Sequence, residues 1–309
     1  MPIKHRTYNP KLILALISVA FFWGTTYLAM RIGVETIPPM LVVSYRNLLA
    51  GSLLLFYLIF KKQLKLIPVS TLKQNIIIAF LLLILANGLT TFAEKYISSG
   101  LAALISSLSP LGILVLNLRL GHEKLPIRNF TGIALALVGI FFIYQNNIDD
   151  LFNPDYRLGI AAILLAVFTW SLGTIYSKKL IQMGGNVLLN TGFQMLFAGV
   201  FLLILQYIVD PQINIALWSF SSIAAVVYLA IFGSLIGYIS YSYALSQLPS
   251  TTVSVFLYIN VIVALFLGWL ILDEKIPLKI VMAAIFIISG VIISNYTNRR
   301  AKTYEIDAV

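Results

Sequence analysis

The side chains with the clearest chemical potential in this chain are polar residues set inside long apolar stretches. Arg46 is the basic residue that lies well inside a predicted membrane-spanning stretch, about 10 Å from Pro39 at roughly 1.5 Å per residue. A charge at that depth costs free energy unless it is paired, hydrated or close to the membrane surface. Three roles stay open for Arg46: bonding near the outer surface, binding a carboxylate, or gating.

A second polar group lies on one predicted helix face. Asn87, Thr91 and Glu94 are spaced by four and seven residues, which places them on the same side of a helix. Polar side chains avoid lipid, so this face is expected to point towards other helices. These residues either join helices near the outer surface or form a gate. Glu94 is also the carboxylate best placed to take up a proton or to pair with Arg46.

Aromatic and hydroxyl side chains form a third group. Its members are Trp23, Thr26, Tyr27, Trp170, Thr174, Tyr238 and Tyr258. Many Trp and Tyr residues of membrane proteins sit at the interfaces with water. The two tryptophans and the last two tyrosines lie too far from the predicted helix ends for that explanation. Aromatic walls with hydroxyl groups suit a small ligand that has an apolar part and a few polar groups.

Pro110 lies inside a predicted span, so we expect it to kink or break that helix near the membrane centre. Broken helices are where carriers place binding sites. The neighbouring residues Ser106, Ser107 and Ser109 either bond the freed carbonyls or contact a ligand. The second half of the chain has Asn260 and a valine where the first half has a serine and Pro110. The sequence therefore does not establish a second kink, and Asn260 is a further candidate ligand-binding residue.

The apolar stretches that carry these residues are long enough to cross a membrane. Of 309 residues, 60% are hydrophobic and 10% are charged, which does not fit a soluble domain of this size. A helix needs about 20 apolar residues to cross the hydrocarbon layer. We therefore predict an all-α integral membrane protein with ten membrane-spanning helices. Their predicted ranges are 12–32, 39–60, 73–95, 98–118, 128–145, 158–180, 187–209, 218–241, 250–271 and 277–295.

The chain contains an internal duplication. The block Glu123-Lys-Leu-Pro126 recurs as Glu274-Lys-Ile-Pro277, 151 positions later. Arg31 and Lys178 also match, because each follows a tryptophan by eight residues. Five helices per half leave the second half upside down, so we predict two inverted five-helix repeats that alternate between two packings. The predicted segments are a tail at 1–11, repeats at 12–146 and 158–296, an external loop at 147–157 and a tail at 297–309.

The net charge of +10 is distributed by side of the membrane and does not form a nucleic-acid-binding patch. With the N-terminus inside, Lys61, Lys62 and Arg299 face the cytoplasm, whereas Asp149 and Asp150 face outside. This distribution follows the rule that positively charged loops stay inside. We therefore expect a multi-pass protein of a bacterial inner membrane, surrounded by lipid, with both termini cytoplasmic and without a nucleic-acid partner.

The chain lacks the groups that an intramembrane enzyme needs. It has no cysteine, which excludes disulfides, thiolate metal sites and a cysteine nucleophile. Its two histidines, His5 and His122, fall in a tail and a loop, and no aspartate falls within a predicted span. A Walker sequence is also absent, so ATP is not the direct energy source. We therefore expect no enzyme activity, no metal and no cofactor.

Four features combine into a recognisable pattern. They are FFWGTTYLAMRIG at 21–33, the spacing from Pro39 to Arg46, SSGLAALISSLSP ending at Pro110, and the doubled Glu-Lys-x-Pro block. In this order, over nearly the whole chain, they resemble the EamA-type carriers of the drug/metabolite transporter superfamily. The resemblance implies a ten-helix inner-membrane carrier, commonly an exporter of amino acids or related metabolites.

We therefore expect a secondary transporter that exports amino acids or related small metabolites by alternating access. One alternative is an exporter of drugs or other amphipathic metabolites, because aromatic walls suit these as well. A membrane scaffold subunit that transports nothing is the alternative from another class. Carboxylates are scarce within the spans, so facilitated efflux or proton exchange is expected in place of tightly bound sodium.

Overall fold

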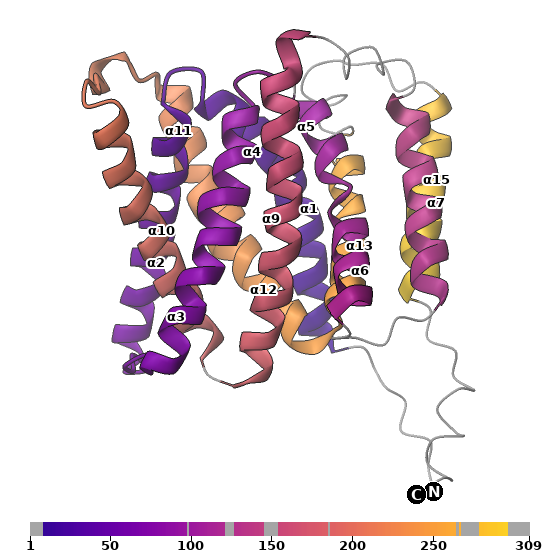
Figure 1. The fold of residues 1–309 in the computed structure, drawn as a ribbon, viewed down its shortest axis with the longest axis horizontal. Coiled ribbons are helices and arrows are strands. Elements are labelled where there is room, and N and C mark those ends of the chain that lie inside the picture. Colours follow the sequence, from indigo (N-terminus) through magenta and orange to yellow (C-terminus); the bar gives the residue numbers. More distant parts are fainter. Residues whose placement is uncertain are drawn as a thin grey trace, which may run out of the picture.

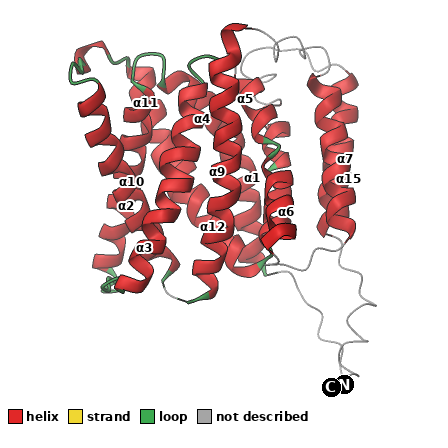
Figure 2. Cartoon of the chain, in the orientation of Figure 1, coloured by secondary structure: helices red, strands yellow, loops and turns green. Residues whose placement is uncertain are grey.

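The computed structural model shows helices running side by side, roughly parallel to one another (Figure 1). It describes residues 9–97, 99–120, 127–144, 154–184, 186–263, 266 and 278–295, in which the regular structure is helical and no strand occurs (Figure 2). The two Glu-Lys-x-Pro blocks, loop residues 147–153 and the terminal segments 1–8 and 297–309 lie outside the described residues. The predicted all-α fold class is confirmed for the described part.

Among the described residues, six helices are long and apolar enough to cross a membrane. They are α1 (Pro10–Gly33), α2 (Pro39–Phe60), the continuous α3 (Val69–Ile78), η1 (Ala79–Ala86) and α4 (Asn87–Ala93), then η3 (Pro154–Tyr156) with α9 (Arg157–Gln182), α10 (Val187–Val209), and the continuous α11 (Phe220–Tyr228), η5 (Leu229–Tyr238) and α12 (Ile239–Gln247). The last of these ends at Gln247 rather than at 241. Tyr241, Ala244 and Leu245 are buried against other helices, although polar residues stand between them in the sequence.

The other four predicted spans contain shorter helices. The span at 98–118 is divided into α5 (Ser99–Ser106) and α6 (Ser109–Leu120), and Pro110 is the second residue of α6. The span at 250–271 begins with α13 (Ser250–Val255) and resumes as a helix at 258–263. The remaining two are α7 (Ile127–Tyr144) and α15 (Leu278–Asn295), and a short η4 (Ile215–Leu217) precedes α11. The second interruption therefore occurs without a proline.

Prolines and N-caps determine where several helices begin. Pro10 and Pro39 each occupy the first helical position, where the missing N–H would have had no helical partner. Asn186 caps α10, because its side-chain oxygen accepts hydrogen bonds from the N–H groups of Leu188 and Leu189 at 3.0 and 3.2 Å. The local sequence thus defines the ends of the helices that carry the site.

Two of the long helices contain a wide π-helical stretch, η1 in the first half and η5 in the second. η5 begins 150 residues after η1, close to the 151-residue spacing of the duplicated block. π-Helical turns contain more residues per turn and are frequent at functional sites. The periodicity of the sequence does not predict them, because both stretches are simply apolar.

Equivalent helices of the two halves pack on each other. α2 packs along α10, and α7 packs along α15 at one end of the molecule (Figure 1). A Cβ atom on Gly132 of α7 would lie 2.6 Å from the carbonyl oxygen of Gly290 of α15, so glycine permits this close approach. α1 packs on η5 and α9 packs on η1. The first helix of each half therefore contacts the third helix of the other.

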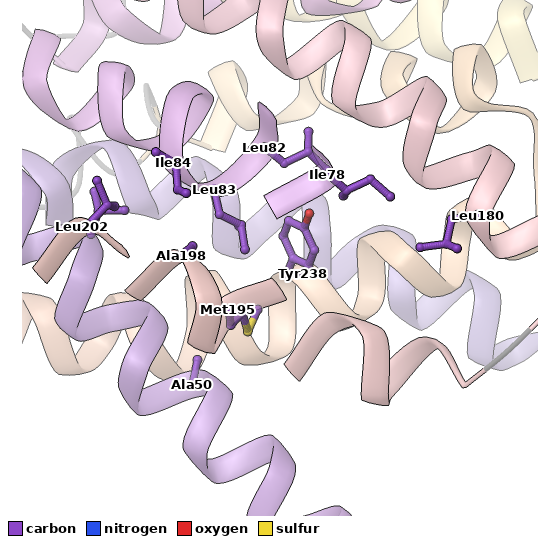
Figure 3. Close-up of a cluster of buried hydrophobic side chains, with 11 residues drawn as sticks. Ala50, Ile78, Leu82, Leu83, Ile84, Leu180, Met195, Ala198, Leu202 and Tyr238 are labelled. Atoms are coloured by element: carbon purple, nitrogen blue, oxygen red, sulfur yellow. The ribbon is translucent and has the colours of Figure 1, made fainter. Parts of the chain in front are cut away.

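A buried apolar cluster joins both halves of the chain. Its side chains belong to α2, α3, η1, α9, α10 and η5, and they are Val43, Ala50, Ile78, Leu82, Leu83, Ile84, Leu180, Met195, Ala198, Leu202 and Tyr238. Figure 3 shows Tyr238 within this cluster, near Met195. Leu83 and Tyr238 also line the cavity between the two halves. The cluster therefore forms one boundary of the candidate site.

Candidate functional site

A cavity lies between the two halves of the chain, and both halves line it. Its internal space, taken as room for the centres of water-sized spheres, is about 100 Å³. One water molecule needs roughly 10–15 Å³ on this measure, so the cavity holds several waters or a small solute. Nine residues predicted from the sequence line it: Trp23, Thr26, Tyr27, Arg46, Asn87, Ser107, Trp170, Tyr238 and Asn260.

Aromatic rings form one wall of the cavity. Trp23 and Trp170, which match in the two halves, meet edge to face with ring centres 5.2 Å apart. Tyr241 packs against both rings, with centres 5.0 and 5.4 Å away. The hydroxyl groups of Thr174 and Tyr241 are hydrogen-bonded at 2.7 Å. Thr174 therefore supports this wall from behind and does not line the cavity.

Arg46 is the charged side chain of the cavity. It is 4% exposed, and its Nε donates a hydrogen bond to Ser234 Oγ at 2.9 Å. A Cβ on Gly233 would lie 3.0 Å from Arg46 Nη2, so glycine leaves room for the guanidinium. Among the described lining residues no other side chain is charged, and none is a carboxylate. A carboxylate that entered the cavity would therefore meet one cationic group, the guanidinium, whose planar geometry matches its own.

Three further lining side chains carry a polar atom that is not hydrogen-bonded. Trp170 Nε1, Tyr238 Oη and Asn260 Oδ1 are buried and have no partner within the described structure. A buried polar atom without a partner costs about 1–3 kcal/mol. By contrast, the matching Trp23 Nε1 donates to the Gly233 carbonyl at 2.9 Å. A ligand or water that bonded to the three atoms would recover that free energy.

Three more predicted residues lie outside the cavity. Thr91 donates to the sulfur of Met30 at 3.2 Å. Tyr258 is buried in an apolar cluster with Leu114 and Ile287, and its hydroxyl has no partner in the described residues. Glu94 is fully buried and interacts electrostatically with Arg31. The pairing of Glu94 with Arg46 that the sequence suggested is therefore not formed.

Four further hydroxyl groups line the cavity. They belong to Thr90, Ser106, Ser109 and Ser234. Asn87 lines the cavity together with Thr90, three residues later, whereas the spacing of four selected Thr91. Both spacings place residues on one helix face, so the sequence alone does not choose between them. Ser234 precedes Tyr238 by four residues and therefore lies on the same face of its helix.

Comparison with known proteins identifies relatives along most of the chain. The uncharacterized inner membrane transporter YedA of Escherichia coli (strain K12) is 34% identical over 255 residues, which cover 82% of this chain and 80% of YedA. The uncharacterized transporter YoaV of Bacillus subtilis (strain 168) is 26% identical over 295 residues, which cover 94% of this chain and 99% of YoaV. The relatives are therefore matched over most of their own length.

A similar fold is also known from experiment. A solved structure titled only "Crystal structure of protein" matches with a TM-score of 0.78 at 17% identity, covering 93% of this chain and 99% of the other. The profile of the EamA-like transporter family matches residues 10–145 and again residues 157–296. The resemblance inferred from the sequence motifs is thus confirmed, and the chain belongs to the EamA-like transporter family.

Proposed function

We propose that this protein is an inner-membrane secondary carrier that exports amino acids or related small metabolites by alternating access. In this proposal all ten predicted spans cross the membrane, six as long helices and four as shorter or interrupted ones. The repeats at 12–146 and 158–296 are inverted relative to each other. The loop at 147–157 is external, and both terminal tails are cytoplasmic.

The packing of the helices fits two repeats related by a two-fold axis, which an inverted arrangement requires. α2 pairs with α10 and α7 pairs with α15, while the contacts between first and third helices are exchanged between the halves. Such exchange is expected when a two-fold axis relates two repeats. The break between α5 and α6 also has a counterpart after α13, and Ser107 and Leu257, which lie at the two breaks, both line the cavity.

The observation that carries the substrate assignment is the polarity pattern of the cavity. Arg46 offers a guanidinium to a carboxylate. Asn260 Oδ1 is a free acceptor for an ammonium group, and the rings of Trp23 and Trp170 can hold an apolar side chain or a cation. These contacts together match the two charges and the side chain of an amino acid.

Exchange in proteoliposomes tests this proposal in either direction of transport. Vesicles containing the purified protein are preloaded with an unlabelled amino-acid pool, and entry of the labelled pool is measured. We expect uptake above that of protein-free vesicles, because exchange requires only that the loaded carrier alternates between its two packings. Sorting the pool by single amino acids then defines the substrate.

Two results would redirect the assignment. Exchange of amphipathic cations that does not depend on Arg46, without exchange of amino acids, would favour a drug exporter, because such ligands need the aromatic wall but not the guanidinium. Folded protein that exchanges neither class would support the scaffold alternative. The folded state is verified in the same vesicles by resistance of the reconstituted protein to a protease.

A further inference from the structure

The two halves of the chain end their third helix with the same kind of contact. Arg31, at the end of α1, donates to the main-chain carbonyl of Glu94, which follows α4 directly. Lys178, near the end of α9, donates to the carbonyls of Leu245 and Leu248 at the end of α12, at 2.5 and 2.7 Å. Leu245 follows Glu94 by 151 residues, the spacing of the duplicated block. A cation at a helix C-terminus is stabilising, so this contact is a structural cap.

The side chain of Glu94 is not required for the cap. The second half forms its cap with Leu245 at the matching position, and the two hydrogen bonds described there are accepted by main-chain carbonyls. The Glu94 side chain is 0% exposed, and neither of its oxygens has a hydrogen-bond partner in the described residues. Burial of a carboxylate without partners is costly when it is ionised. The first half thus contains a buried carboxyl group that the cap does not need, and the second half has no such group at the matching position.

The surroundings of Glu94 offer its carboxyl group few partners. Tyr27 and Arg31, one turn apart on α1, are the titratable side chains that interact with it electrostatically. α2, η1 and α9 also pack on α4, and their described residues contribute no further charged partner. Arg46 of α2 is bonded to Ser234 instead. Arg31 has its guanidinium on the Glu94 carbonyl, so the carboxyl group has no hydrogen bond from it.

We propose that Glu94 is a proton-binding site that couples export of the substrate to inward movement of a proton. This inference rests on the proposed carrier function. In the described arrangement the carboxyl group holds the proton. When the proton leaves to water, Arg31 moves from the Glu94 carbonyl to the new carboxylate and neutralises it. That move releases the cap between α1 and α4, at the end of the bundle that the proposed topology places outside.

Tyr27 links this site to the cavity. It lines the cavity, interacts with Glu94 and is hydrogen-bonded through its side chain to Ser106. Tyr27 and Arg31 are four residues apart and therefore on one face of α1. A substrate that displaces Tyr27 therefore moves the same turn of α1 that carries Arg31, the partner of ionised Glu94. Through this turn of α1, substrate binding and proton binding can compete.

The first test measures the carboxyl group without any substrate. Infrared difference spectra of the reconstituted protein at neutral pH, wild type minus Glu94→Gln, should contain the carbonyl band of a protonated carboxylic acid. Glutamine keeps the shape of the protonated side chain, so the variant is expected to fold. Absence of the band from this spectrum would overturn the inference. So would a band that occurs only in the spectrum of wild type minus Glu35→Gln. Glu35 is the matched control, because it is exposed and lies near the same helix ends.

The second test measures coupling. Vesicles with an acidic interior receive the labelled amino-acid pool outside, with the membrane potential clamped by valinomycin and equal potassium. If one proton is exchanged per substrate, one pH unit supports about tenfold accumulation. We expect this accumulation with wild type and Glu35→Gln, and its loss with Glu94→Gln and with Glu94→Leu, the residue of the second half. If both Glu94 variants accumulate substrate to the same level as wild type, the proposal is wrong.

Failure of the carrier function is recognised separately. If neither wild type nor Glu35→Gln exchanges the pool without a gradient, the proposed function fails. The infrared band then still decides whether Glu94 holds a proton. If exchange is normal but neither wild type nor any variant accumulates substrate in response to the pH gradient, the carrier function stands and the coupling role of Glu94 is refuted.

Discussion

At the scale of single residues, matching positions of the two halves have acquired different chemistry. Trp23 and Trp170 touch each other, yet the N–H of Trp23 is used by the Gly233 carbonyl while that of Trp170 has no partner in the described structure. At the positions of Glu94 and Leu245 the residue type itself differs, because one half has a buried carboxyl group and the other an apolar side chain. A duplicated fold provides two similar frameworks, and the unpaired polar groups mark positions at which the two halves differ.

The tryptophan pair leads to a matched prediction. Trp23→Phe and Trp170→Phe remove the same atoms, but only the first leaves the Gly233 carbonyl without its donor. We expect Trp23→Phe to lower the free energy of unfolding by about 1 kcal/mol more than Trp170→Phe. Trp170→Phe should instead raise the substrate concentration needed for half-maximal exchange. Denaturant unfolding in detergent and exchange kinetics measure the two effects, and equal losses of stability would contradict the assignment.

Arg46 gives the second prediction at this scale. A hydrogen bond to a charged group contributes about 1.5–3 kcal/mol, so Arg46→Ala should lower affinity for carboxylate-bearing substrates about tenfold or more. Arg46→Lys keeps the charge but not the planar guanidinium, so its affinity for these substrates should fall between those of wild type and Arg46→Ala. Size-exclusion profiles in detergent check that both variants insert and fold. A loss of folded protein that parallels the loss of exchange would identify Arg46 as a structural residue.

At the scale of helices, close packing through glycine determines which elements can pair. The same substitution has opposite expected effects at two glycines. At Gly88 no atom lies within 4 Å of an added Cβ, so Gly88→Ala should stabilise the helix by up to about 1 kcal/mol. At Gly132 the added Cβ meets the Gly290 backbone, so Gly132→Ala should destabilise the protein by about 1–3 kcal/mol. Unfolding in detergent measures both, and a stable Gly132→Ala variant would show that α7 and α15 are not in tight contact.

The helices also show how far the sequence determines the fold. Apolar length predicted where they occur, and the predicted starts at 39 and 187 coincide with those of α2 and α10. The π-helical stretches η1 and η5 were not predictable, because a wide turn depends on what packs against it and leaves no periodic trace. The break after α13 was left open by the sequence, since no proline marks it. Local propensity alone therefore does not predict these features.

The candidate site was predictable in composition but not in arrangement. Polar residues inside apolar spans are costly, so Arg46 and Asn260 were recognised by type alone. Whether Thr90 or Thr91 faces the cavity depends on how α4 is rotated about its axis, and this rotation follows from η1. Arg31 and Glu94 are 63 positions apart in the sequence, so no local pattern predicts that they meet.

At the scale of the whole molecule, the orientation of the two repeats decides whether one cavity can open to both sides in turn. Two inverted repeats have equal but opposite packings available, so the cavity between them alternates without moving through the membrane. Two parallel repeats would lack this exchange. The orientation is therefore the property of the fold on which the proposed function depends most.

The chain is well suited to a direct measurement of this orientation, because it contains no cysteine and any introduced thiol is unique. Lys62 and Asp210 follow α2 and α10, the paired second helices of the two halves, and both are exposed. Inverted repeats place Lys62 in the cytoplasm and Asp210 outside. In intact cells a membrane-impermeant maleimide should label Asp210→Cys at once and Lys62→Cys only after the membrane is permeabilised. Equal labelling of both thiols from outside would require parallel repeats, and the cavity could not then alternate by exchange of equivalent packings.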